Sequence, residues 1–198
     1  MRRLDKLAVF RDPGDRPPVP LVPPVIYYTG SVMAFDQSLV HTGWVEVRFT
    51  ADFFDIKRYG TLEGGSVSGF EASLDRAHKL YWELLDIMPR PLLLAEYVTL
   101  CEMPSVRGNR TDSALLGALA VRMSIPSSLP PPILVSRQRA ATLLTGSPGA
   151  PKREIRKALR ELYPRLSKLD KLGEHEADAL AIAISWAHDF KEVGRGPK

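Results

Sequence analysis

Hydrophobic and polar positions change their spacing several times along the chain, and each change predicts a new element of secondary structure. The first apolar stretches alternate with polar residues or run continuously over a few positions, which is typical of β-strands. They predict strands at residues 26–35, 44–49 and 56–59, which would form an antiparallel meander. Residues 60–69 contain four glycines and are expected to form a loop after the third strand.

After residue 70 the spacing becomes helical, with apolar residues recurring every three or four positions. The expected helices cover residues 71–88, 113–123, 137–144, 152–163 and 174–190. Residues 92–101 are almost all apolar and predict a central strand that is buried on both faces, and residues 133–135 predict a short fifth strand. This succession predicts an α/β fold in which a five-stranded mixed sheet is flanked by helices.

The length of 198 residues is enough for one domain with a sheet and helices packed on it. Six prolines between residues 13 and 24 fix φ and remove backbone donors. Residues 1–24 are therefore expected to form an extended, proline-rich lead-in. The core domain is expected to cover residues 25–192, and residues 193–198 a short tail.

Composition narrows the class of protein. Cys101 is the only cysteine, which excludes a disulfide within the chain and a zinc-ribbon site. No apolar stretch approaches the ~20 residues needed to cross a bilayer, and the first residues lack the long apolar core of a secretory signal. A soluble, cytoplasmic protein without a membrane partner is expected.

Charge is distributed unevenly along the chain. Residues 51–103 hold nine acidic against five basic side chains, whereas residues 137–171 hold ten basic against three acidic ones. In the helix predicted at residues 152–163, one face is apolar and the other is cationic. A basic segment beside acidic clusters suits a nuclease, since basic side chains bind phosphates and carboxylates bind a cation. The alternative is a solvated surface.

Three carboxylates stand at the ends of predicted elements: Asp36 after the first strand, Glu102 after the long apolar strand, and Asp178 near the start of the last helix. Ligands gather at strand ends in open α/β sheets, so Asp36 and Glu102 are expected to approach each other. His175 and Asp178 lie about one helical turn apart and can reach a common point. Oxygen ligands in such number suit Mg²⁺ or Mn²⁺, and a cation would relieve the repulsion between the carboxylates. Asp36 could instead form a hairpin turn, and Asp178 could favour a helix N-terminus.

Three short motifs occur in order between about residues 26 and 190. They are Asp36-Gln37-Ser38 with Thr42-Gly43, Thr99-Leu100-Cys101-Glu102 followed by Thr111-Asp112-Ser113-Ala114-Leu115, and His175-Glu176-Ala177-Asp178 followed by Ala179-Leu180-Ala181-Ile182-Ala183. Each motif alone is weak. Together, in this order and on these elements, they resemble the RuvC family of Holliday junction resolvases in the ribonuclease H-like superfamily.

The resemblance implies a ribonuclease H-like fold and a homodimer that binds branched DNA, especially four-way junctions. Such a dimer nicks two opposed strands and leaves 5′-phosphate and 3′-hydroxyl ends. By resemblance, Asp36, Glu102 and Asp178 would be metal-binding catalytic carboxylates, and His175 would join them, around two Mg²⁺ ions that Mn²⁺ can replace. The basic residues expected at the DNA, from the resemblance and from the cationic helix face, are Arg137, Arg139, Lys152, Arg153, Arg156, Lys157 and Arg160.

The chain departs from the family at Ser105, where many members carry an aromatic residue used against the bases at the junction centre. Strict preference for four-way junctions is therefore left open. Two other functions also stay open. One is an actin-like or sugar-kinase-type ATPase, because an Asp before a Thr-Gly hairpin also forms their phosphate loop, although the chain is too short for their two domains. The other is a non-catalytic module that binds branched DNA, against which the three intact carboxylates argue.

Overall fold

The computed structural model describes residues 23–50, 53–65, 69–88, 97–104, 111–127 and 129–193. Its framework is a sheet with the strand order β3-β2-β1-β4-β5. The strands are β1 (Gly30–Asp36), β2 (His41–Phe49), β3 (Phe54–Glu63), β4 (Tyr97–Glu102) and β5 (Ile133–Val135). The first three form an antiparallel meander, and β4 and β5 extend the sheet parallel to β1. The predicted five-stranded mixed sheet is confirmed.

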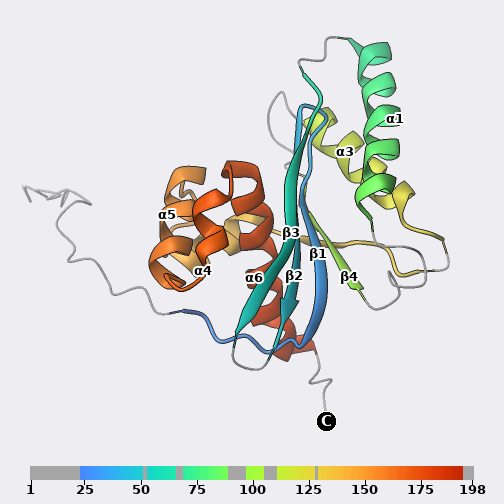
Figure 1. Cartoon of the computed structure of the whole chain (residues 1–198). Coiled ribbons are helices and arrows are strands. Elements are labelled where there is room, and N and C mark those ends of the chain that lie inside the picture. Colours follow the sequence, from blue (N-terminus) through green and yellow to red (C-terminus); the bar gives the residue numbers. More distant parts are fainter. Residues whose placement is uncertain are drawn as a thin grey trace, which may run out of the picture.

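Helices cover both faces of this sheet (Figure 1). On one face lie α1 (Phe70–Ile87) and α3 (Thr111–Ser124). On the other face lie α4 (Arg137–Thr145), α5 (Lys152–Leu162) and α6 (Glu174–Val193), and the short 3-10 helix η2 (Ser167–Lys171) connects α5 to α6. Within the described residues, each predicted helix is present, with its ends shifted by no more than a few positions. None of the described helices is long and apolar enough to cross a membrane.

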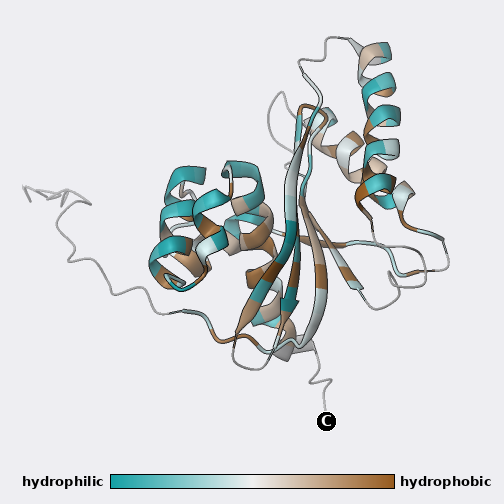
Figure 2. Cartoon of the chain, in the orientation of Figure 1, coloured by the Kyte–Doolittle hydropathy of each residue, from teal (hydrophilic) through white to brown (hydrophobic). Residues whose placement is uncertain are grey.

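The sheet separates two apolar cores (Figure 2). On the α6 face, small side chains let the helix backbone lie close to β1 and β2; the buried alanines of α6 are Ala177, Ala179, Ala181, Ala183 and Ala187. On the α1 face, Met33 and Phe35 of β1 pack with Leu80 and Leu84 of α1 and Val121 of α3. Residues of β1 therefore enter both cores alternately, as a central strand requires.

The first strand begins at Gly30, so the prediction that it begins at residue 26 is wrong. The preceding residues pack on α6 instead of joining the sheet. The N–H of Tyr27 donates to the carbonyl of Ala187 over 3.0 Å, and the ring of Tyr28 meets Trp186 edge-on at 4.6 Å. An apolar run cannot by itself distinguish a strand from an extended segment that covers a helix.

The third strand continues to Glu63, so the prediction of a loop from residue 60 is also wrong. Gly60 pairs with Trp44 in the β2–β3 ladder. A Cβ at residue 60 would lie 3.2 Å from the indole nitrogen of Trp44, so this glycine provides space for a ring rather than a turn.

Parts of five predictions lie outside the described residues: most of the proline-rich lead-in, residues 66–68 of the loop, residues 92–96 of the fourth strand, the departure from the family at Ser105, and residues 194–198 of the tail.

Candidate active site

The three predicted carboxylates lie at one end of the sheet. In the parallel pairing of β1 with β4, Phe35 stands opposite Cys101, so Asp36 and Glu102 are the next residues at the same end. The N-terminal turn of α6 reaches this end as well. It can do so because residue 43 is glycine: a Cβ there would overlap the main chain of His175. The missing side chain of Gly43 therefore permits the close approach of α6 to the β1–β2 hairpin.

Asp36 and Asp178 are both buried and share one lysine. The ammonium of Lys152 lies 2.7 Å from Asp36 Oδ2 and 2.8 Å from Asp178 Oδ2. His175 Nδ1 lies 2.9 Å from the same oxygen of Asp36, and Arg137 Nε lies 3.4 Å from Asp178 Oδ2. Lys152 and Arg137 are the first residues of α5 and α4, so the starts of three helices converge on the carboxylates.

The two neighbouring carboxylates of β1 and β4 have opposite pKa shifts. Burial acts to raise the pKa of Asp36, but the hydrogen bond with His175 and the charge of Lys152 outweigh it and lower that pKa to about 2. Burial, followed by the nearby charges of Asp36 and Asp178, raises the pKa of Glu102 to about 8. Burial also raises the pKa of Asp178 despite Lys152. The raised pKa of Glu102 thus reflects burial beside the charges of the two aspartates.

The donors present fit a divalent cation in chemical type. Oxygen ligands from several carboxylates are those that Mg²⁺ and Mn²⁺ prefer. Asp178 Oδ1 is buried and has no hydrogen-bond partner among the described residues, as expected for an oxygen reserved for another ligand. Within the part of the chain that the structure describes, however, no three His, Cys, Asp or Glu side chains are arranged closely enough to hold a metal ion. The ammonium of Lys152 lies between Asp36 and Asp178.

Two residues beside Asp36 were missed by sequence reasoning. The ring of His41, at the start of β2, stacks on His175 with centroids 5.0 Å apart and an angle of 27° between the planes. The side-chain amide of Gln37 contacts the backbone of Glu102. The only signal in the sequence is their position within or next to the Asp36 motif.

The predicted DNA-binding residues fall into two groups. Arg137 and Lys152 belong to the carboxylate cluster itself, and Arg139 pairs with Asp189 of α6 over 2.5 Å. On α5 the apolar face is buried as predicted, which leaves the basic side chains outward. Arg160 is held by Asp170 at 3.3 Å, and Lys157 lies 3.6 Å from Glu161, so Arg153 and Arg156 are the members of this face with no ion pair among the described residues.

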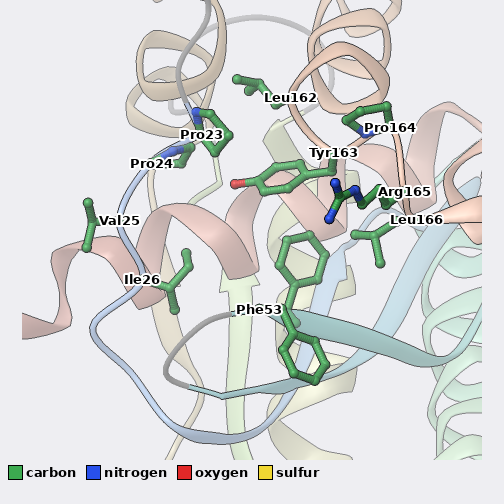
Figure 3. Close-up of a pocket in the computed structure, with 11 residues that line it drawn as sticks. Pro23, Pro24, Val25, Ile26, Phe53, Leu162, Tyr163, Pro164, Arg165 and Leu166 are labelled. Carbon is green, nitrogen blue, oxygen red and sulfur yellow. The ribbon is translucent and has the colours of Figure 1, made fainter.

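A pocket of about 710 Å³ lies away from these groups, between the start of the described chain, the β2–β3 connection and the end of α5 (Figure 3). Its walls are mainly apolar, with Phe53 on one side and Tyr163 and Pro164 on another. The described side chains that line it include no carboxylate. The candidate catalytic chemistry therefore belongs to the carboxylate end of the sheet and not to this pocket.

Comparisons with known proteins agree with this architecture at the level of the fold. No protein-family model matches the sequence, and no curated protein matches it. Among solved structures, Thermus thermophilus RuvC has a TM-score of 0.60 at 18% identity, covering 82% of this chain and 96% of that chain. The T. thermophilus RuvC complex with a Holliday junction substrate gives 0.59 at 16% identity, with the same coverages. The yeast mitochondrial Holliday junction resolvase Ydc2 gives 0.54 at 15% identity, covering 85% and 84%. The chain thus has a RuvC-like, ribonuclease H-like fold.

Proposed function

We propose that this protein is a metal-dependent endonuclease that resolves four-way DNA junctions. The observation that carries the proposal is the convergence of Asp36, Glu102 and Asp178, from distant parts of the chain, at one end of β1 and β4. This convergence occurs in a fold shared with RuvC and Ydc2, and one of the RuvC structures contains a Holliday junction substrate. Fold alone does not determine function, so the carboxylate site is the stronger argument.

The three carboxylates would hold two Mg²⁺ or Mn²⁺ ions, with His175 as a further ligand or as the residue that orients Asp36. When bound, such ions lower the pKa of an attacking water and stabilise charge on the leaving 3′-oxygen, which gives 5′-phosphate and 3′-hydroxyl ends. Lys152 and Arg137 stand beside the carboxylates and would bind the non-bridging oxygens of the phosphate that enters the site.

The DNA arms would follow the basic face of α5. Arg153 and Lys157 are exposed on this face, and Arg156 lies between them with its Nε buried and unbonded among the described residues. Such a face would contact phosphates without reading bases. Arg139 of α4 would contribute from the neighbouring helix, although its pairing with Asp189 competes with DNA.

A homodimer would supply the two sites that opposed nicks require, because a junction with two-fold symmetry is matched by a two-fold assembly. The support on this chain is an apolar stripe on the outer face of α3. Leu115, Leu119 and Met123 recur every four residues, and each is about half exposed or more. Exposed apolar side chains gathered in this way are typical of a protein–protein contact.

The test uses the purified chain with labelled four-way, Y-shaped and linear DNA, each with Mg²⁺, Mn²⁺ or EDTA. We expect paired nicks in the four-way junction with either ion, none with EDTA, and little cutting of linear duplex. Binding without cutting under every condition would overturn the proposed nuclease activity and favour a non-catalytic module that binds branched DNA. Hydrolysis of ATP without DNA would overturn it in favour of an ATPase.

A further inference from the structure

The side chain of Gln37 makes a double hydrogen bond with the main chain of Glu102. Its Nε2 donates to the Glu102 carbonyl over 2.6 Å, and its Oε1 accepts from the Glu102 N–H over 3.0 Å. Gln37 is only 4% exposed. A long polar side chain is rarely buried to this extent unless its polar atoms are satisfied, and both ends of this amide are.

This contact continues the sheet by one position. The β1–β4 ladder ends with Phe35 opposite Cys101, because the chain turns away after Asp36. A primary amide has the same donor and acceptor as a peptide group, so Gln37 replaces the missing strand at Glu102. On its other side Glu102 still pairs with Val135 of β5. The backbone of Glu102 is therefore held from both sides.

The turn that carries Gln37 is itself fixed by the helices of the opposite face. The N–H of Leu39 donates to Ser113 Oγ of α3 over 3.0 Å, and Arg76 Nε of α1 donates to the carbonyl of Leu39 over 2.9 Å. Gly117 of α3 lies against Ser38 so closely that a Cβ there would come within 3.1 Å of the Ser38 backbone. The turn that carries the Gln37 side chain is thus held by contacts with both α1 and α3.

Gln37 directly follows Asp36 in the chain, so its bonds to Glu102 tie together the main chains that carry two of the site carboxylates. The side chains of Asp36 and Glu102 share a hydrogen bond, and the neutral amide of Gln37 fixes the separation of the two main chains without adding charge to this acidic pair. We propose that Gln37 is a positioning residue that sets Glu102 at its working distance from Asp36. The inference rests on the proposed function, because the separation of Asp36 and Glu102 matters here for metal binding and DNA cleavage.

The rival explanation is that Gln37 only satisfies buried backbone groups and stabilises the fold. Gln37→Met keeps the length of the side chain but removes both hydrogen bonds. Gln37→Glu keeps an acceptor for the Glu102 N–H, loses the donor to its carbonyl, and adds a negative charge. The matched control is Ser124→Ala in α3, which removes another buried side-chain hydrogen bond, the 2.8 Å bond to Val121, at a residue that is also 4% exposed.

Three quantities are measured on the full chain: hydrogen exchange of the Glu102 amide, Mn²⁺ affinity by calorimetry without DNA, and the cleavage rate at saturating junction. In Gln37→Met we expect faster exchange at Glu102, Mn²⁺ affinity lower by about 10-fold, and a rate lower by about 10–100-fold, because groups that orient metal ligands have effects of this size. Gln37→Glu should also exchange faster at Glu102 and cleave more slowly, because the donor to the Glu102 carbonyl is lost. Ser124→Ala should change the melting temperature only.

Unchanged Mn²⁺ affinity and cleavage rate in a folded Gln37→Met protein would overturn the positioning role. If Gln37→Met does not fold, the same comparison is made with Gln37→Glu. A wild-type chain that neither binds Mn²⁺ nor cuts DNA would instead overturn the proposed function. The exchange measurement separates the two failures, because it reports the contact between Gln37 and Glu102 whether or not the protein is a nuclease.

Discussion

The two faces of the sheet differ in what they contribute to the candidate site. From the α6 face come Asp178, His175, Lys152 and Arg137, whose charged atoms converge on Asp36. Among the residues that the structure describes, the α1 and α3 face adds no charged side chain to this cluster; it makes the contacts that fix the turn after Asp36. Chemistry and support thus come from opposite faces and meet at one turn. The α1 and α3 contacts therefore position Asp36 for the ion pairs that reach it from the α6 face.

The faces also differ in their outer surfaces. Residues 137–171, which form α4, α5 and η2, are rich in basic side chains, whereas α1 belongs to an acidic stretch and α3 presents apolar ones. A DNA backbone is attracted to the basic surface of α4, α5 and η2 and is repelled by the acidic stretch that contains α1. A second copy of the chain is better suited to α3. Variants on the α3 face can therefore separate assembly from the chemistry and DNA binding of the α6 face.

The largest effect is expected at the carboxylates. Asp36→Asn, Glu102→Gln and Asp178→Asn should each lower the cleavage rate by at least about 10³-fold while junction affinity stays within a few-fold, because metal ligation and most phosphate contacts lie on different residues. Single-turnover cleavage and binding in EDTA measure the two quantities. Asp55→Asn, a carboxylate paired with Lys57 on β3, is the control and should behave as wild type. Full turnover in any of the three variants would contradict its assignment.

Lys152→Ala should have the next largest effect. The lysine bridges Asp36 and Asp178, and beside a scissile phosphate it would stabilise charge that develops in the transition state. We expect the cleavage rate to fall by about 10²-fold and the junction affinity by much less. Lys157→Ala, at the exposed side of the same helix, is the matched control, and it should affect affinity rather than rate. If Lys152→Ala lowered the junction affinity more than the cleavage rate, the scissile phosphate would lie away from Lys152.

The residues changed in these variants differ in whether the sequence alone predicts their role. Hydrophobic spacing predicts the sheet and helices because strands and helices bury residues at different periods, and element ends indicate Asp36, Glu102 and Asp178. It could not predict that Lys152 bridges two carboxylates or that Gln37 replaces a strand, because both depend on how a turn is oriented between elements distant in sequence. The role of Gly60 is not predictable for the same reason, because it depends on the ring of Trp44 across the ladder.

On the other face, charge placed on α3 should break assembly. Met123→Lys puts a cation in the apolar stripe, where burial without a partner is costly, and should convert a dimer at micromolar concentration into a monomer. Sedimentation velocity measures this, and the paired nicks should become independent. The control is Phe53→Lys at the pocket, since Phe53 and Met123 are both 61% exposed. A wild-type chain that sediments as a monomer with junction DNA would argue against paired incision.

The stability of the metal-free protein should depend on Glu102. Because its pKa in the folded state is raised to about 8, the folded protein binds a proton that the unfolded chain releases near pH 4.5. The stabilisation of the folded state by this proton is complete below pH 4.5 and is lost as the pH rises to about 8. Between pH 6 and 9 the melting temperature should fall by several degrees, since about 1 kcal/mol shifts it by 2–4 °C in a domain of this size. Glu102→Gln should flatten the dependence, and Mg²⁺ should reduce it in the wild type only.

The smallest effect is expected on the basic face of α5, where charge acts over a distance and salt screens it. Arg153→Gln with Arg156→Gln should weaken binding to all branched DNAs about equally and flatten the slope of log affinity against log salt by roughly 0.9 for each lost phosphate contact. Arg160→Gln is the internal control, because its guanidinium is held by Asp170. If the double variant keeps the wild-type slope, this face is only solvated, and the DNA must be bound through Arg137, Arg139 and Lys152 at the starts of α4 and α5. The chemistry of the α6 face would then extend no further than the carboxylate cluster itself.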